Sequence, residues 1–164
     1  MTLQLLYTIV LRKENMKKIL ITAVIAMAAT AASALEVGVQ VGRDFGDANR
    51  NFGGLTVGQS LGPVTLSAGY HRTSVTANDQ NRWSVVGGYD LLKVGPVQLT
   101  PTVGAAYLSN KTTSNGLAMT VGVEASMPLY KSLEGVVDYT YQIGQSRVSQ
   151  FDGNRVSAGL RYKF

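Results

Sequence analysis

From residue 36 to the C-terminus, apolar and polar residues alternate along the chain in eight segments. A period of two is typical of a β-strand with one apolar and one polar face, and these segments lack the period of an amphipathic helix. The apolar series runs from Val37 to Phe164 and contains no charged residue in any segment. The alternation therefore predicts an all-β fold of eight antiparallel strands.

The opposite series is polar or very small, and it is rich in Gly, Ser and Thr. A soluble sandwich can also alternate in this way. A water-facing surface does not require so many glycines, however, whereas the interior of a narrow closed barrel needs small residues. We therefore expect this face to line a lumen, with its charges in an internal salt-bridge network: Glu36, Asp90, Glu124, Glu134, Asp138 and Arg161. Arg161 is the expected hub, and an ion path or a gate is the alternative interpretation of these charges.

Aromatic residues gather toward the ends of the segments. One expected girdle holds Tyr70, Trp83, Tyr107 and Tyr141, and the other holds Tyr89, Tyr130, Tyr162 and Phe164. Twin girdles are typical of a lipid-exposed barrel. The connections alternate between short turns (61–63, 93–96 and 128–132) and longer polar loops (about 43–52, 73–81, 109–116 and 144–154).

These features predict an eight-stranded antiparallel up-and-down transmembrane β-barrel. In hydrocarbon every backbone N–H and C=O needs an internal partner, which an antiparallel sheet provides only when its first and last strands pair. Residues 36–43 are therefore expected beside 155–164.

The N-terminal region has the three parts of a secretory signal peptide. Two lysines follow Met16, an apolar run starts at Ile19, and a small-x-small site ends at Ala34. The run is shorter than a transmembrane helix requires and is diluted by Ala and Thr. We therefore expect residues 1–15 to be a start-site extension, 16–34 a cleaved signal peptide and 35–164 the barrel.

Composition narrows the possible chemistry. The chain has 164 residues, no Cys and one His, which excludes disulfides, Cys-based metal sites and thiol catalysis and leaves no metal or cofactor site predicted. The formal charge is +5, but residues 35–164 hold eleven basic and nine acidic residues, a net +2. No basic stripe remains for nucleic acid.

The C-terminal segment, residues 156–164, alternates to the last residue and ends on Phe. It resembles the C-terminal signal of Gram-negative outer-membrane barrels, and the whole of 36–164 resembles the small eight-stranded families that include the OmpA transmembrane domain and OmpX. The resemblance implies recognition by the outer-membrane assembly machinery through Leu160, Tyr162 and Phe164. It also implies periplasmic chaperones during biogenesis, outer-membrane lipid and lipopolysaccharide as surroundings, and a monomer.

The predicted fold also resembles that of eight-stranded barrel enzymes that acylate or deacylate lipid A with His, Ser and a carboxylate. The only histidine here is His71, and Ser84 is expected on the neighbouring strand. The deacylase pattern His-x-Ser fails, because Thr73 stands where the nucleophile is required. We therefore predict no enzymatic activity; a lipid A-modifying enzyme is the weakest alternative.

Basic residues at or near the outer rim are candidates for contact with lipopolysaccharide phosphates: Arg43, Arg50, Arg72, Lys111, Arg147 and Arg155. Ordinary solvated loop charges are the alternative. The sequence thus predicts an outer-membrane barrel with a largely closed lumen and a structural or cell-surface interaction role in the Gram-negative envelope. A narrow passive pore for water, ions or very small solutes is the alternative function.

Overall fold

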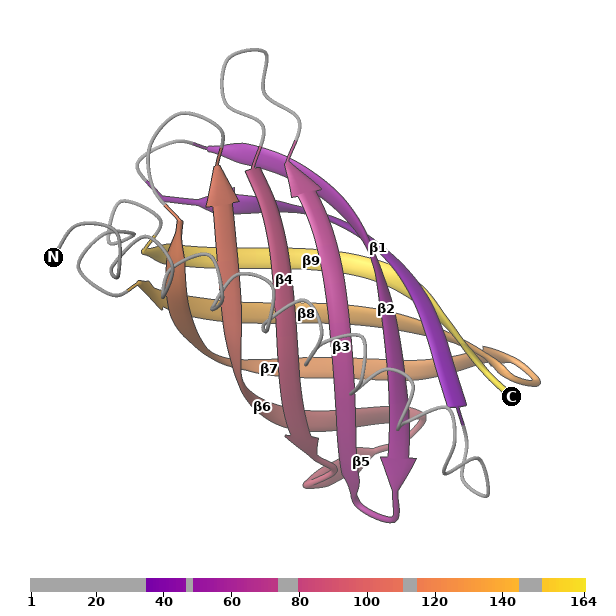
Figure 1. Ribbon diagram of the computed structural model, residues 1–164. Coiled ribbons are helices and arrows are strands. Elements are labelled where there is room, and N and C mark those ends of the chain that lie inside the picture. Colours follow the sequence, from indigo (N-terminus) through magenta and orange to yellow (C-terminus); the bar gives the residue numbers. More distant parts are fainter. Residues whose placement is uncertain (1–34, 47–48, 74–79, 111–114, 145–151) are drawn as a thin grey trace, which may run out of the picture. The chain divides into compact units, whose positions relative to one another are not determined.

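The computed structural model describes residues 35–46, 49–73, 80–110, 115–144 and 152–164. The predicted start-site extension and signal peptide lie outside these residues. In the part that is described, no helix is long and apolar enough to cross a membrane. The described strands form one antiparallel sheet (Figure 1): β1 (Leu35–Phe45), β2 (Arg50–Leu61), β3 (Val64–Thr73), β4 (Gln80–Tyr89), β5 (Leu92–Val94), β6 (Val97–Asn110), β7 (Gly116–Tyr130), β8 (Leu133–Gly144) and β9 (Gly153–Lys163).

The strands β4 and β5 make up one wall of the barrel, because both pair with β6. They are separated only at Asp90 and Leu91. The Asp90 N–H still donates to the carbonyl of Pro63 (2.7 Å), and the Leu91 N–H donates to that of Leu99 (3.2 Å), so the hydrogen bonding continues across the break. The predicted eight-stranded all-β barrel is therefore confirmed.

The sheet closes where β1 pairs with β9, in a register from Glu36 opposite Lys163 to Phe45 opposite Asn154. Figure 1 shows these two strands side by side. A path of paired residues once around the barrel returns to β8 ten residues from its start at Glu134; it passes Arg161, Gly38, Thr56, Gly69, Ser84, Ala106 and Ala118 and ends at Gly144. This stagger over eight strands implies a strand tilt of roughly 40°.

Three two-residue turns lie at the rim where β1 begins and β9 ends. Gly62 and Gly95 adopt φ of 63° and 60°, the left-handed region that the first position of a type II′ hairpin turn requires. The third turn uses Lys131 with φ of 44°. The turns expected at 93–96 and 128–132 are shorter than predicted, because β5 and the last part of β7 continue the ladder to residues 94 and 130.

The loops at the opposite rim are also shorter than predicted. The strands continue to Phe45, Thr73, Asn110 and Gly144, leaving connections at 46–49, 74–79, 111–115 and 145–152. Most of these connecting residues lie outside the described ranges. The difference arises because polar residues such as Arg43 and Asp44 end the apolar–polar alternation but keep their backbone pairing.

Burial in this barrel is the reverse of that in a soluble protein. On the outside, Val39, Val103 and Val137 are 52%, 57% and 53% exposed. Glu36 and Ser157, on the inside, are 3% exposed. An exterior composed of large apolar side chains around a polar interior is the arrangement of a barrel whose solvent is lipid.

Candidate functional site: the barrel lumen

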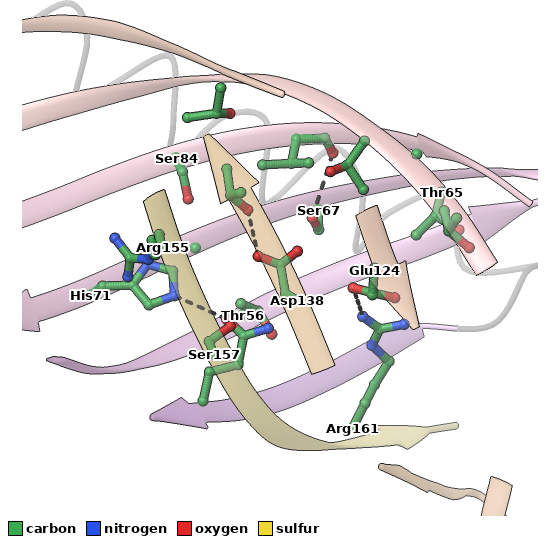
Figure 2. A pocket seen from close by; sticks show the side chains of 18 of the residues that line it. Thr56, Thr65, Ser67, His71, Ser84, Glu124, Asp138, Arg155, Ser157 and Arg161 are labelled. Atoms are coloured by element: carbon green, nitrogen blue, oxygen red, sulfur yellow. Dashed lines mark hydrogen bonds and ion pairs between the residues drawn. The ribbon is translucent and has the colours of Figure 1, made fainter. Parts of the chain in front are cut away.

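The lumen contains a cavity of about 70 Å³ lined almost wholly by polar side chains. Figure 2 shows His71, Ser84 and Arg155 toward one end of this cavity and Glu124 and Arg161 toward the other. Each side chain points inward because it occupies the polar register of its strand. The two ends carry different charge clusters.

Arg161 on β9 is the centre of the cluster near the turns. Its guanidinium lies 2.5 Å from Glu124 Oε2, 3.3 Å from Glu36 Oε2 and 4.0 Å from Glu134 Oε2. Glu36 comes from β1 and Glu134 from β8, the two neighbours of β9, whereas Glu124 reaches across from β7. Arg161 thus links side chains from four strands of the barrel: β1, β7, β8 and β9.

Lys163 and Ser60 complete this cluster. Lys163 Nζ lies 2.8 Å from Glu134 Oε1 and 3.6 Å from Glu36 Oε1. The Ser60 hydroxyl donates to Glu36 Oε1 at 2.6 Å. Glu36, 3% exposed, therefore has three partners, which compensates the cost of burying its charge.

Two acids that the sequence assigns to the same network have other partners. Asp138 accepts a hydrogen bond from the Thr140 hydroxyl (2.5 Å), and Asp90 accepts one from the Thr100 hydroxyl (2.7 Å). Asp138 lies directly opposite Glu124 in the β7–β8 pair, but the carboxylate that contacts Arg161 is that of Glu124.

The second cluster lies in the outer half of the lumen, around the ring of Phe52. The Arg155 guanidinium stacks over this ring at 3.4 Å from its centroid, and the His71 ring meets it edge-on at 5.5 Å. Arg155 Nε also lies 3.6 Å from Asp44 Oδ1. Arg82, 6% exposed, lines the same cavity from β4.

Several inward glycines leave space that a neighbouring ring or the backbone of the next strand occupies. A Cβ on Gly42 would fall on the Phe52 ring, and one on Gly54 would fall on the His71 ring. At Gly122 a Cβ would collide with the carbonyl oxygen of Tyr139. The glycines therefore compensate for large neighbours, which is how a narrow lumen is filled.

We expect Gly122→Ala to destabilise the barrel by about 1–3 kcal/mol, because the added methyl overpacks the wall. The matched control is Gly87→Ala, where the nearest atoms to an added Cβ are 3.9 Å away. Because glycine weakens a strand, the control is expected to be neutral or stabilising by about 0.5–1 kcal/mol. Urea unfolding of both variants in detergent measures the difference, and equal stabilities would contradict the close packing at Gly122.

His71 and Ser84 do not form a catalytic pair. His71 Nε2 lies 3.1 Å from Gln40 Oε1, and its Nδ1 has no hydrogen-bond partner among the described residues. Neither ring nitrogen is therefore bonded to the Ser84 hydroxyl, as activation of a serine nucleophile would require. Among all the residues that the structure describes, no group of three or more His, Asp or Glu residues is arranged to hold a metal ion.

The expected aromatic girdles lie at the two ends of the strands. Tyr70, Trp83 and Tyr107 are successive register partners on β3, β4 and β6, and the Tyr70 and Trp83 rings are 4.5 Å apart. Tyr141 lies three residues before the end of β8 at the same rim. At the turn rim, Tyr89 faces Val64, and Tyr162 faces Val37 and Leu133.

The C-terminal residues proposed as an assembly signal share the exterior face. Leu160, Tyr162 and Phe164 are 45%, 47% and 72% exposed, and the last two rings are 4.8 Å apart. The N–H of Phe164 donates to the carbonyl of Leu35 at 2.9 Å, which ties the end of the chain to the first strand.

The rim arginines divide between the two faces. Arg43 and Arg72 are exposed and lie in the exterior register, where Arg43 is 5.7 Å from the Phe45 ring centroid. Arg50 shares the inward register of Phe52. Arg155 is only 7% exposed and lies in the lumen, so its placement at an accessible rim was wrong. Arg155 lies an even number of residues before Arg161 on β9, so the two side chains point to the same face of the strand. Lys111 and Arg147 lie outside the described residues.

Sequence reasoning missed Phe52 and Arg82 as members of the outer cluster. Both occupy the polar register, two residues before Gly54 and Ser84 respectively. Extending the alternation of β2 by two residues toward the outer rim would have placed Phe52 in the lumen, where the polar series of β4 already places Arg82. The contacts of Phe52 with Arg155 and His71 have no local sequence signal, because they depend on how β2, β3 and β9 meet inside the barrel.

No protein-family model matches the chain, and no curated protein matches it by sequence. Solved structures do match. Neisserial surface protein A is 15% identical, with a TM-score of 0.54 over 80% of this chain and 96% of that one. A major outer membrane protein from Thermus thermophilus is 17% identical, with a TM-score of 0.54 over 80% of this chain and 100% of that one.

A de novo designed transmembrane β-barrel is 21% identical, with a TM-score of 0.54 over 80% of this chain and 96% of the design. Identities this low establish the fold alone. Almost the whole of each of these barrels matches about four-fifths of this chain. The chain is therefore a small eight-stranded β-barrel with the fold of the outer-membrane barrels, and this likeness assigns it to no single family among them.

Proposed function

We propose that this protein is an integral outer-membrane barrel with a structural or surface-interaction role in the Gram-negative envelope and a largely closed lumen. The observation that carries the proposal is the reversed burial, with an apolar exterior around a lumen filled by paired charges. A cleaved signal peptide at 16–34, chaperone-assisted transit and insertion through the C-terminal Leu160, Tyr162 and Phe164 are parts of the same proposal. A monomer surrounded by lipid is also part of the proposal, supported by the large apolar side chains exposed on the exterior.

Several contacts support a closed lumen. Arg161 and its three carboxylate partners occupy the interior near the turns, and Arg155, Phe52 and His71 occupy it in the outer half. A passing ion would have to displace groups that neutralise one another, and an unpaired charge in so narrow a space is costly.

Planar-bilayer conductance tests this proposal. We expect folded protein extracted from membranes to produce no conductance steps in the bilayer. The heat-dependent gel shift of intact barrels is the folding control. Discrete, reproducible channels from protein that passes this control would overturn the closed lumen.

A narrow passive pore is the second candidate, favoured by the cavity of about 70 Å³ that reaches from one charge cluster to the other. It predicts conductance that increases when Glu124→Gln weakens the contact with Arg161 across the lumen. The exterior substitution Val123→Leu is the matched control, since Val123 faces outward on the same strand.

At the surface, we propose that Arg43 and Arg72 contact lipopolysaccharide phosphates, because both are exposed on the exterior near the outer rim. An enzymatic role has the least support. The single histidine is held between Gln40 and Phe52 inside the barrel, away from the lipid that a lipid A-modifying enzyme must reach.

A further inference from the structure

The outer cluster holds buried cationic donors that the protein itself leaves unsatisfied. Arg82 and Arg155 are 6% and 7% exposed. Arg82 Nε, Arg82 Nη1 and Arg155 Nη2 are buried and have no hydrogen-bond partner among the described residues. In this respect the cluster differs from the inner one, where Arg161 meets three carboxylates.

The groups around these donors do not satisfy them. Asp44 on β1 approaches Arg155 through Nε only, and Asp138 on β8 accepts a hydrogen bond from the Thr140 hydroxyl. The charges of both carboxylates act on the two arginines, but these donors remain without a hydrogen bond. The Phe52 ring covers one face of the Arg155 guanidinium and offers no hydrogen-bond acceptor in its plane. A buried donor on a charged group costs at least about 1–3 kcal/mol when it is left unpaired. An acceptor is therefore missing from this part of the lumen.

The chemistry of the missing acceptor follows from the donors. A guanidinium presents its N–H groups as a planar fork that matches two oxygens of an oxoanion. His71 adds a second requirement: with its Nε2–H directed at Gln40 Oε1, the unpartnered Nδ1 is an acceptor. An oxoanion that still carries a proton, such as hydrogen phosphate, offers oxygens to the arginines and an O–H to Nδ1.

We propose that the outer half of the lumen binds one small protonated oxoanion of the hydrogen phosphate class, held by Arg82 and Arg155 and oriented by His71. The three residues line the same cavity of about 70 Å³. A single water needs about 10–15 Å³ of such space, so the cavity has room for more than one water-sized group. The barrel wall separates the site from the surrounding lipid, so the occupant is a free anion and not a lipid headgroup.

Phe52 and the glycines position the site. Gly42 leaves the space that the Phe52 ring occupies, and Gly54 leaves the space for the His71 ring. Phe52 in turn holds Arg155 flat and His71 edge-on. The sequence thus places an aromatic residue in an otherwise polar register, where it fixes the direction of a cation.

Calorimetric titration with sodium phosphate tests the proposal, using full-length folded protein in a non-ionic detergent and sodium chloride to hold the ionic strength constant. We expect saturable binding of one phosphate per barrel, weakened about tenfold or more by Arg82→Gln, since one charge-assisted pair is lost. Lys163→Gln is the matched control, because it removes a cation from the other end of the lumen. It should leave the affinity unchanged.

Absence of saturable binding, or equal binding to the wild type and Arg82→Gln, would overturn the proposal. Equal weakening by Lys163→Gln would also overturn it, since the effect would then come from general charge. If Arg82→Gln fails the gel-shift folding control, Arg82→Lys takes its place. That variant keeps the charge but loses the fork, and it is likewise expected to bind phosphate more weakly.

Discussion

Val121→Arg is expected to destabilise the folded barrel by about 2–4 kcal/mol, the cost of an arginine on the lipid face near the bilayer midplane. Val121 is 46% exposed on β7 and pairs with Val103 and Tyr141 on the neighbouring strands. The folded fraction in lipid vesicles, read from the heat-dependent gel shift across a urea series, measures the change.

Two controls separate polarity from position. Val121→Leu keeps the site apolar and should fold like the wild type. Leu91→Arg introduces the same charge at the turn rim, between β4 and β5, where the expected cost falls to about 0–1 kcal/mol. If Val121→Arg folds as well as both controls, the assignment of this face to lipid is wrong. Arginine at the adjacent Thr120 is no control, because Thr120 is 2% exposed in the packed lumen.

Arg161→Met is expected to cost about 3–5 kcal/mol, because removing one member of a buried ion cluster leaves charges without compensation. Glu36 and Glu124 would lose their contacts at 3.3 and 2.5 Å, and only Glu36 retains another cation, Lys163. Urea unfolding in detergent measures the loss of stability.

Lys163→Met is the matched control. The Lys163 side chain is 36% exposed, so its ion pairs are worth about 0–1 kcal/mol. Adding Glu124→Gln to Arg161→Met removes the stranded carboxylate and should restore part of the stability. If Arg161→Met and Lys163→Met have equal small effects, the cluster around Arg161 does not stabilise the barrel.

Several features of the fold could be predicted from the sequence because they follow from a local period. Alternation at every second residue assigned Val39 and Val103 outward and Glu36 inward, and the need to pair every backbone group in lipid placed β1 beside β9. The same reasoning identified Arg161 as a hub between the strands that carry Glu36 and Glu134, since neighbouring strands bring these residues into register.

The ends of the strands were harder to predict from the sequence. The loops at the outer rim were predicted too long, because polar residues such as Arg43 and Asp44 end the hydrophobic alternation but continue the backbone ladder. The interruption at Asp90 likewise has no clear signal, since its hydrogen bonds join it to Pro63 in the turn between β2 and β3 and to Thr100 on β6.

The sequence by itself thus determined which face of each strand meets lipid, and which strands must meet to close the barrel. Only the tertiary structure decided which inward side chains touch. Arg161 reaches Glu124 two strands away, and Arg155 stacks on the Phe52 ring that His71 meets edge-on, while Arg82 keeps unsatisfied donors. The physical reason is that the direction of each side chain, outward or inward, follows from the local two-residue repeat of a strand. Contacts across the lumen depend on the strand tilt and on the ten-residue stagger, which exist only once the sheet has closed into a barrel.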